Sequence, residues 1–128
     1  MKKPIVPKKF SHYYSNLHFS PAVESQGFIF CSGATGTRPD GSISESPEIQ
    51  FRDAFETVQL YLNEVGLSFD NVVEMTTYHI HLREHLEVFK AVKDEFVKEP
   101  YPAWSAIGVS EFITEGALVE IRVIASRE

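Results

Sequence analysis

Glu120 is the residue whose position in the sequence most invites a chemical role. It lies in the alternating run 119–125, whose odd-numbered positions are apolar and whose opposite face carries Glu120 and Arg122. Partial burial raises the pKa of a carboxyl group and suits it to general acid or base catalysis. An ion pair with Arg122, or with an arginine of another subunit, would explain the same carboxylate without catalysis. Both interpretations are open at this point.

Trp104 is the second candidate, in the alternating segment 100–109 that precedes Glu120. This segment places Trp104, Ala106 and Gly108 on one face of an expected strand. Trp104 offers a large apolar face and one N–H donor, so it can either stack on a flat or cationic ligand or fill a pocket and serve a subunit interface. We expect these three residues on the sheet face that no helix covers, where copies of the chain would meet.

Cysteine and histidine give weaker signals. Cys31 is the single cysteine, which excludes an internal disulfide, and its apolar neighbours predict a buried, unreactive thiol rather than a nucleophile. His79, His81 and His85 could hold zinc or copper, because the first two share one face of a strand. The histidines lack the i, i+4 helical spacing of metalloproteases, and we expect no metal and no cofactor.

The composition excludes several classes of protein. A chain of 128 residues with 43% hydrophobic content predicts one domain, residues 1–128, with a single core. The formal net charge of -6 argues against nucleic acid as a partner, because phosphate binding needs clustered lysine and arginine. Lys2, Lys3, Lys8 and Lys9 form only a small basic tip. We find no signal peptide and no apolar run of about 20 residues, so we expect a cytoplasmic protein.

The elements that must position these residues follow from periodicity and turn signals. Strands are expected at 19–25, 27–32, 72–82, 100–109 and 119–125, with helices at 47–65 and 85–98. Gln26 and Gly27 mark a hairpin, Ser46 an N-cap and Gly66 a helix end. These elements predict an α+β fold, a mixed β-sheet with two helices packed on one face.

Several of these segments together resemble a known family. They are HFSPAV at 18–23, IFCSG at 29–33, VGL at 65–67 with VVEMTT at 72–77, PYPAWSAIGV at 100–109 and VEIRVIA at 119–125. On these residues the chain is identified as a member of the YjgF/Rid family of reactive intermediate deaminases, also labelled endoribonuclease L-PSP or RutC-like. The segment 100–109 is similar to a divergent, YjgH-like branch. The resemblance implies a chorismate-mutase-like Rid fold that assembles as a homotrimer, with a pocket in each subunit cleft.

The resemblance also implies site residues. Glu120 occupies the position of the glutamate that places a water for attack on an imine carbon. Phe19 stands at a pocket tyrosine without its hydroxyl, and Ser32 and Gly33 match the Ser-Gly pair that ends the second strand, although serine and glycine are common in any such turn.

Two further positions depart from the family pattern. Trp104 stands where the family has the arginine that grips the substrate carboxylate, and Ala106 stands where many members have cysteine. Loss of a bidentate charged contact costs at least ~3 kcal/mol, or about a hundredfold in affinity. The ligand therefore either lacks a carboxylate or is held elsewhere.

Three functions remain open on this basis. The resemblance implies a homotrimer that binds a small, largely apolar or aromatic metabolite and hydrolyses a reactive imine or enamine. The alternative is a non-catalytic protein, either binding a small molecule or mediating interactions, in which Trp104 fills the pocket. The older family labels of translation initiation inhibitor and endoribonuclease are disfavoured by the net charge and by the lack of an RNA-stacking platform.

Overall fold

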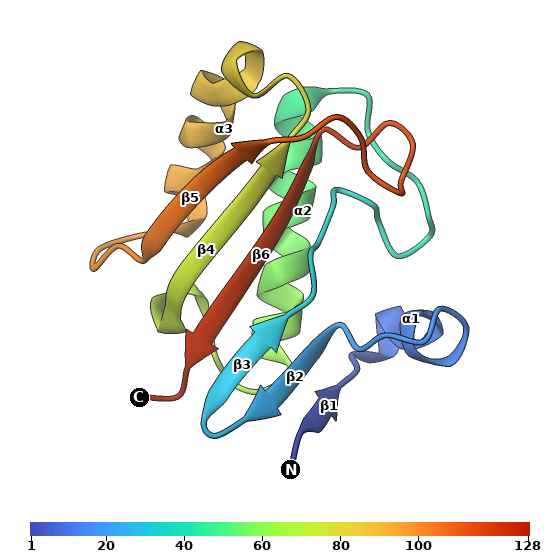
Figure 1. Cartoon of the computed structure of the whole chain (residues 1–128), viewed down its shortest axis with the longest axis vertical. Coiled ribbons are helices and arrows are strands. Elements are labelled where there is room, and N and C mark those ends of the chain that lie inside the picture. Colours follow the sequence, from blue (N-terminus) through green and yellow to red (C-terminus); the bar gives the residue numbers. More distant parts are fainter.

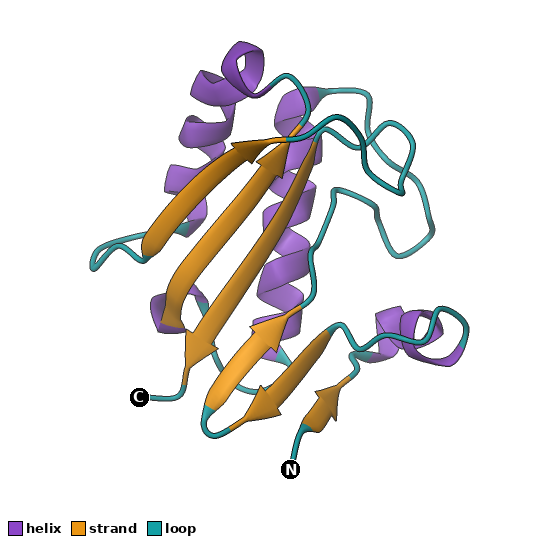
Figure 2. Ribbon diagram, viewed as in Figure 1, coloured by secondary structure: helices purple, strands orange, loops and turns teal.

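A computed structural model describes all 128 residues. The chain forms one mixed sheet with two long helices on one face (Figures 1 and 2). The strands are β1 (Lys3–Ile5), β2 (Ala22–Ser25), β3 (Phe28–Cys31), β4 (Val72–His79), β5 (Ala103–Gly108) and β6 (Val119–Ser126). The helices are α1 (Ser11–Ser15), α2 (Pro47–Asn63) and α3 (Leu82–Phe96), with short 3-10 turns at Lys8–Phe10 and Phe69–Asn71. The sheet order is β1-β2-β3-β6-β4-β5, in which only the β4–β5 pair is parallel. The expected α+β fold is confirmed.

The local signals in the sequence act where they were expected. Gln26 and Gly27 both have positive φ, 56° and 80°, as a tight two-residue hairpin between β2 and β3 requires. The Ser46 side chain accepts a hydrogen bond from the Ile49 N–H and caps α2. Gly66 follows the end of that helix with φ 77°.

Four element boundaries differ from the prediction by three residues each. β2 begins at Ala22 and β5 at Ala103, three residues later than expected in each case. Pro102 has no N–H to offer a neighbouring strand, so pairing starts only after it. The left-handed conformation of His81, φ 53°, separates β4 from α3, so the strand ends early and the helix begins at Leu82.

The N-terminal segment contributes more than a basic tip. β1 pairs with β2 as the edge strand of the sheet, and Ile5 is buried under it. Phe10 is also buried, and its ring packs edge-on against that of Tyr61 in α2, with the ring centroids 5.3 Å apart. The short segment from β1 to α1 therefore closes one end of the core.

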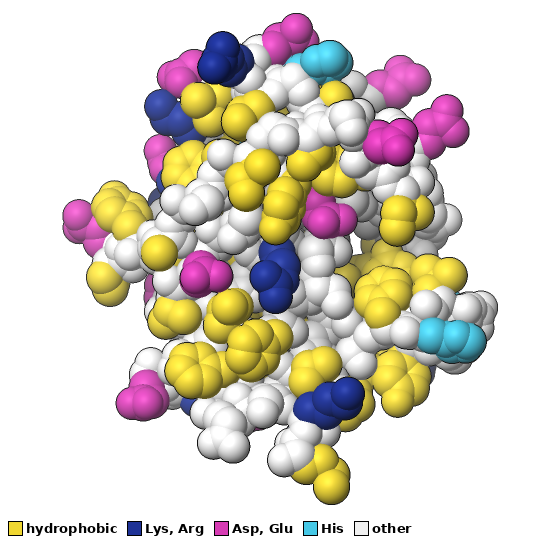
Figure 3. All heavy atoms as spheres, viewed as in Figure 1, with side chains coloured by type: hydrophobic (Ala, Val, Ile, Leu, Met, Phe, Trp, Pro, Cys, Tyr) yellow, Lys and Arg dark blue, Asp and Glu magenta, His cyan; other side chains and the backbone are white.

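One face of the sheet has no helix over it. In Figure 1 the view is onto this face, with α2 and α3 behind. Figure 3 shows apolar side chains spread over it, with a basic side chain near the middle. Phe28, Phe30, Val73 and Ile107 are exposed, and β6 places Arg122 among the strands of this face. Exposed large apolar groups in this number are typical of a surface that meets another molecule.

The expectation that Trp104, Ala106 and Gly108 lie on this uncovered face is wrong. Trp104 pairs with the buried Met75 of β4, and its ring lies 6.1 Å from that of Phe89 in α3. The alternation in 100–109 correctly grouped these residues on one face. Alternation alone does not say which face meets the helices, and both faces of this edge strand carry apolar residues.

Candidate functional site

Glu120 lies on the uncovered face of β6, opposite Tyr78 of β4. It is half-buried, and burial alone raises the pKa of its carboxyl group above the usual value. No hydrogen bond or ion pair forms between Glu120 and Arg122, although both side chains share this face. Within one protomer, the ion-pair interpretation of Glu120 therefore has no support.

Gly33 leaves space beside the backbone for the Glu120 carboxylate. A Cβ atom at position 33 would lie 2.5 Å from Cδ of Glu120 and 2.6 Å from Oε2, well inside contact distance. The bridge between Ala34 and Ile121, with N–H···O distances of 2.8 and 2.9 Å, holds the chain after β3 against β6 at this point. Glycine is thus needed here so that the carboxylate can lie against the backbone. The structure brings Gly33 and Glu120 together.

Ser32 forms two hydrogen bonds that hold neighbouring segments together. Its hydroxyl donates to the Ser20 carbonyl at 2.7 Å and its N–H donates to the Pro21 carbonyl at 2.9 Å. These bonds fasten the segment before β2 to the end of β3. The hydroxyl proton is therefore committed, and only its acceptor lone pairs remain for a ligand.

Phe19 lies just before that fastened segment, outside any strand and partly exposed. Its ring stacks on Tyr13 with centroids 5.1 Å apart. Burial raises the pKa of Tyr13, so its phenol stays protonated and can donate. The sequence prediction noted the missing hydroxyl at Phe19 but missed this neighbouring phenol, because Tyr13 lies in a short helix that had no periodic signal.

Trp104 is anchored on the helix side of the sheet. Its Nε1–H donates to Oγ1 of Thr77 at 2.9 Å, and the same oxygen lies 2.8 Å from Nε2 of His79. The Thr77 hydroxyl keeps its own proton and a second lone pair after accepting from the indole, so it serves either tautomer of the His79 ring. Burial lowers the pKa of His79 to about 4, in agreement with a neutral ring.

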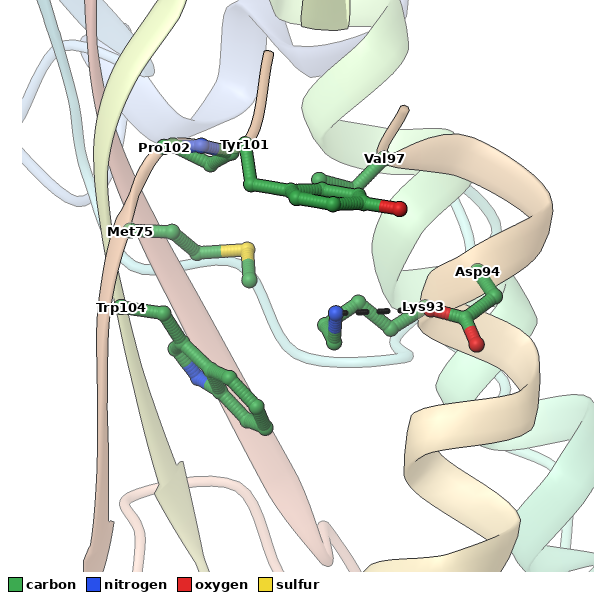
Figure 4. Close-up of a pocket in the computed structure, with 7 residues that line it drawn as sticks. All are labelled: Met75, Lys93, Asp94, Val97, Tyr101, Pro102 and Trp104. Atoms are coloured by element: carbon green, nitrogen blue, oxygen red, sulfur yellow. Dashed lines mark hydrogen bonds and ion pairs between the residues drawn. The ribbon is translucent and has the colours of Figure 1, made fainter. Parts of the chain in front are cut away.

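A cavity of about 250 Å³ opens beside Trp104, between α3 and the chain that leads into β5 (Figure 4). It is lined by Met75, Lys93, Asp94, Val97, Tyr101, Pro102 and Trp104. The Lys93 Nζ lies over the Trp104 ring, 4.8 Å from its centroid. Lys93 and Tyr101 were not among the predicted site residues, since only the fold brings them to Trp104.

The predicted site residues fall into two groups on opposite faces of the sheet. Glu120 and Gly33 belong to the uncovered face, whereas Trp104 lies on the helix face. Ala106 follows Trp104 on the same strand face, next to Thr77 of β4, and is exposed. One protomer therefore does not bring Glu120 and Trp104 into one pocket.

The remaining candidates stay apart from both groups. Cys31 is buried and burial raises the pKa of its thiol to about 12, as expected for an unreactive cysteine. His79 is buried, while His85 points to Glu84 at 3.3 Å. No three histidine, cysteine or acidic side chains gather as metal ligands would. No helix has the length and apolarity to cross a membrane.

Comparison with known proteins gives consistent matches over most of the chain. The family model described as Endoribonuclease L-PSP matches residues 11–127. The RutC family protein YjgH of Escherichia coli is 34% identical over 113 residues, which cover 88% of this chain and 85% of that protein. A RutC family protein of Aquifex aeolicus is 34% identical over 109 residues, covering 84% and 86% of the two chains.

Solved structures agree with these matches. A protein called YJGH superposes with a TM-score of 0.89 at 31% identity, covering 98% of this chain and 95% of its own. RidA from an Antarctic Psychrobacter species superposes with a TM-score of 0.79 at 28% identity, covering 84% and 87%.

Proposed function

Since this chain belongs to the Endoribonuclease L-PSP family, whose solved relatives carry the YjgF and Rid names, we propose that it is a homotrimer that hydrolyses a reactive imine or enamine. The catalytic group is Glu120. Phe19, Ser32 and Gly33 line the same side of the site, and Trp104 and Ala106 of a second copy complete it. No metal or cofactor takes part in the proposal.

The observation that supports this proposal is the state of the Glu120 carboxylate. It is half-buried, has a raised pKa, has no partner within the protomer and lies against the backbone at Gly33. A carboxylate in that state is suited to accept a proton from water. The water oxygen then bonds to the imine carbon, Glu120 returns the proton to nitrogen, and the carbinolamine collapses to a carbonyl with release of ammonia.

The placement of the candidate groups supports a shared site. Glu120 and Trp104 lie on opposite faces, so a pocket that uses both needs two copies of the chain. The uncovered face supplies apolar surface for such an assembly through Phe28, Phe30 and Ile107. Self-association is therefore part of the proposed function rather than an addition to it.

The anchoring of Trp104 favours one alternative. Its hydrogen bond to Thr77 and its packing near Phe89 hold the indole in place, as a group that fills a pocket would be held. On that alternative the protein binds a small molecule or a partner without catalysis. We do not extend the endoribonuclease label to this chain, because its net charge of -6 opposes phosphate binding.

The test is hydrolysis of freshly generated 2-imino acids and of aromatic imines without a carboxylate, followed as ammonia release. Glu120→Gln should lower the rate by ~100-fold or more, the usual scale for a general base, with unchanged molar mass. Glu56→Gln is the matched control, since Glu56 is an exposed carboxylate on α2. Wild-type protein that hydrolyses none of these substrates, or Glu120→Gln protein as active as wild type, would overturn the deaminase proposal and favour the binding protein.

A further inference from the structure

We propose that the cavity between α3 and the start of β5 binds a planar aromatic carboxylate, with its ring between Tyr101 and Trp104 and its carboxylate on the Lys93 ammonium. This site goes beyond the proposed imine hydrolysis, and of the residues proposed there it shares only Trp104. It lies on the helix face of the sheet and does not use Glu120.

The charge of the cavity is set by Lys93. The side chain of Lys93 is only 14% exposed, although an ammonium group is strongly hydrated in water. Its nearest carboxylate oxygen, on the neighbouring Asp94, is 3.5 Å away on a side chain that is 72% exposed. Because the Asp94 carboxylate is largely hydrated, this pair is weak. Lys93 is therefore a partly desolvated cation without a firm counter-ion, and a ligand carboxylate is the group that it lacks.

The shape of the cavity is set by two aromatic rings. Figure 4 shows Tyr101 and Trp104 on two sides of an opening, with Met75 between them at the sheet and Lys93 opposite, on the helix. Tyr101 is 66% exposed in the protomer. Flat rings pack favourably in offset stacks on aromatic side chains, and methionine sulfur makes a favourable contact with a ring edge.

The volume limits the size of the ligand. Pockets for drug-sized molecules occupy roughly 300 Å³ or more. A cavity of about 250 Å³ therefore suits one or two fused rings. The ring supplies the stacked surface and the carboxylate supplies the charge, so neither a neutral aromatic nor a non-aromatic acid of the same size should bind as well.

The test uses the single tryptophan of the chain as its reporter. Trp104 is the only tryptophan, so quenching of its fluorescence reports ligand beside its ring, and the loss of that signal in a Lys93→Gln variant assigns the ligand to this cavity. Benzoate should quench it saturably, while benzamide, which lacks the charge, and cyclohexanecarboxylate, which lacks the flat ring, should each bind at least ~10-fold more weakly. Saturable quenching by benzoate that benzamide matches in affinity would overturn the proposal.

Variants separate the two contributions. Lys93→Gln should weaken benzoate binding ~10-fold or more and leave benzamide unchanged, whereas Tyr101→Ala should weaken both. Lys90→Gln is the matched control on the same helix, because Lys90 is exposed and pairs with Glu87. Equal loss of benzoate binding in Lys90→Gln, or none in Lys93→Gln, would refute the assignment. Glu120→Gln should still bind benzoate, so failure of the proposed hydrolysis would leave this test intact.

Discussion

Replacing Gly33 by alanine should lower the rate of hydrolysis much more than it lowers the free energy of unfolding. The new Cβ would lie 2.5, 2.6 and 2.7 Å from three atoms of the Glu120 side chain, so that side chain must move. Those atoms are the end of a flexible side chain, which can swing away at a cost of about 0.5–1.5 kcal/mol for an unfavourable rotamer. The loss of stability should therefore stay at or below about 1.5 kcal/mol.

The effect on hydrolysis should be much larger than the effect on stability. A displacement of about 1 Å at a catalytic group can cost about 100-fold in rate, or ~2.7 kcal/mol of barrier. Stability is measured by urea unfolding and the rate by ammonia release with the same imine substrates. The Glu120→Gln variant sets the lowest expected rate of hydrolysis, and the rate of the Gly33→Ala variant should approach it.

A matched glycine tests the reasoning behind these numbers. Gly108 lies in β5, and a Cβ there would meet only Leu82 at an ordinary 3.9 Å. Gly108→Ala should therefore unfold at the same urea concentration as wild type or a higher one, because alanine restricts the unfolded chain. Wild-type hydrolysis by Gly33→Ala protein would show that the position of the carboxylate against Gly33 is irrelevant to catalysis. A loss of stability above ~3 kcal/mol would show that the local backbone cannot yield.

Three further outcomes follow from the structure. Burial holds the pKa of His79 near 4, below its usual 6.5, so this neutral imidazole stabilises the fold above pH 6.5. That contribution is lost as pH falls from about 6.5 to 4, at up to ~1.4 kcal/mol per pH unit, and urea midpoints should lose this slope in a His79→Leu variant. Ile107→Lys on the uncovered face should lower the molar mass in solution to that of the protomer, and an unchanged assembly would exclude this face from the interface. Cys31 should react with a thiol reagent only at the rate of unfolding, and rapid labelling of native protein would contradict its burial.

Much of the fold could be predicted from local signals in the sequence. The N-cap at Ser46 and the hairpin at Gln26 and Gly27 each involve only residues close together in the chain. The residue types that favour such a cap or turn can therefore be recognised in the sequence. β1 was missed because three residues at an edge have too little pattern to recognise.

The candidate site was less predictable, because its geometry depends on contacts between distant segments. The alternation around Trp104 grouped the correct residues but could not say which face meets α3. Lys93 approaches Trp104 only because β5 lies beside β4 and under that helix. The close approach of Gly33 to Glu120 likewise comes from one isolated bridge between Ala34 and Ile121.

The position of β6 has a consequence for biosynthesis. This strand is made after the other five, yet it lies between β3 and β4 in the centre of the sheet (Figure 1). Until it emerges from the ribosome, the nascent chain holds two separate strand groups, each with an open edge where β6 will pair. Folding must then wait for long-range pairing, which is slow and leaves those edges available to other chains. A chaperone that shields β3 and β4 at this stage would protect the yield of native protein.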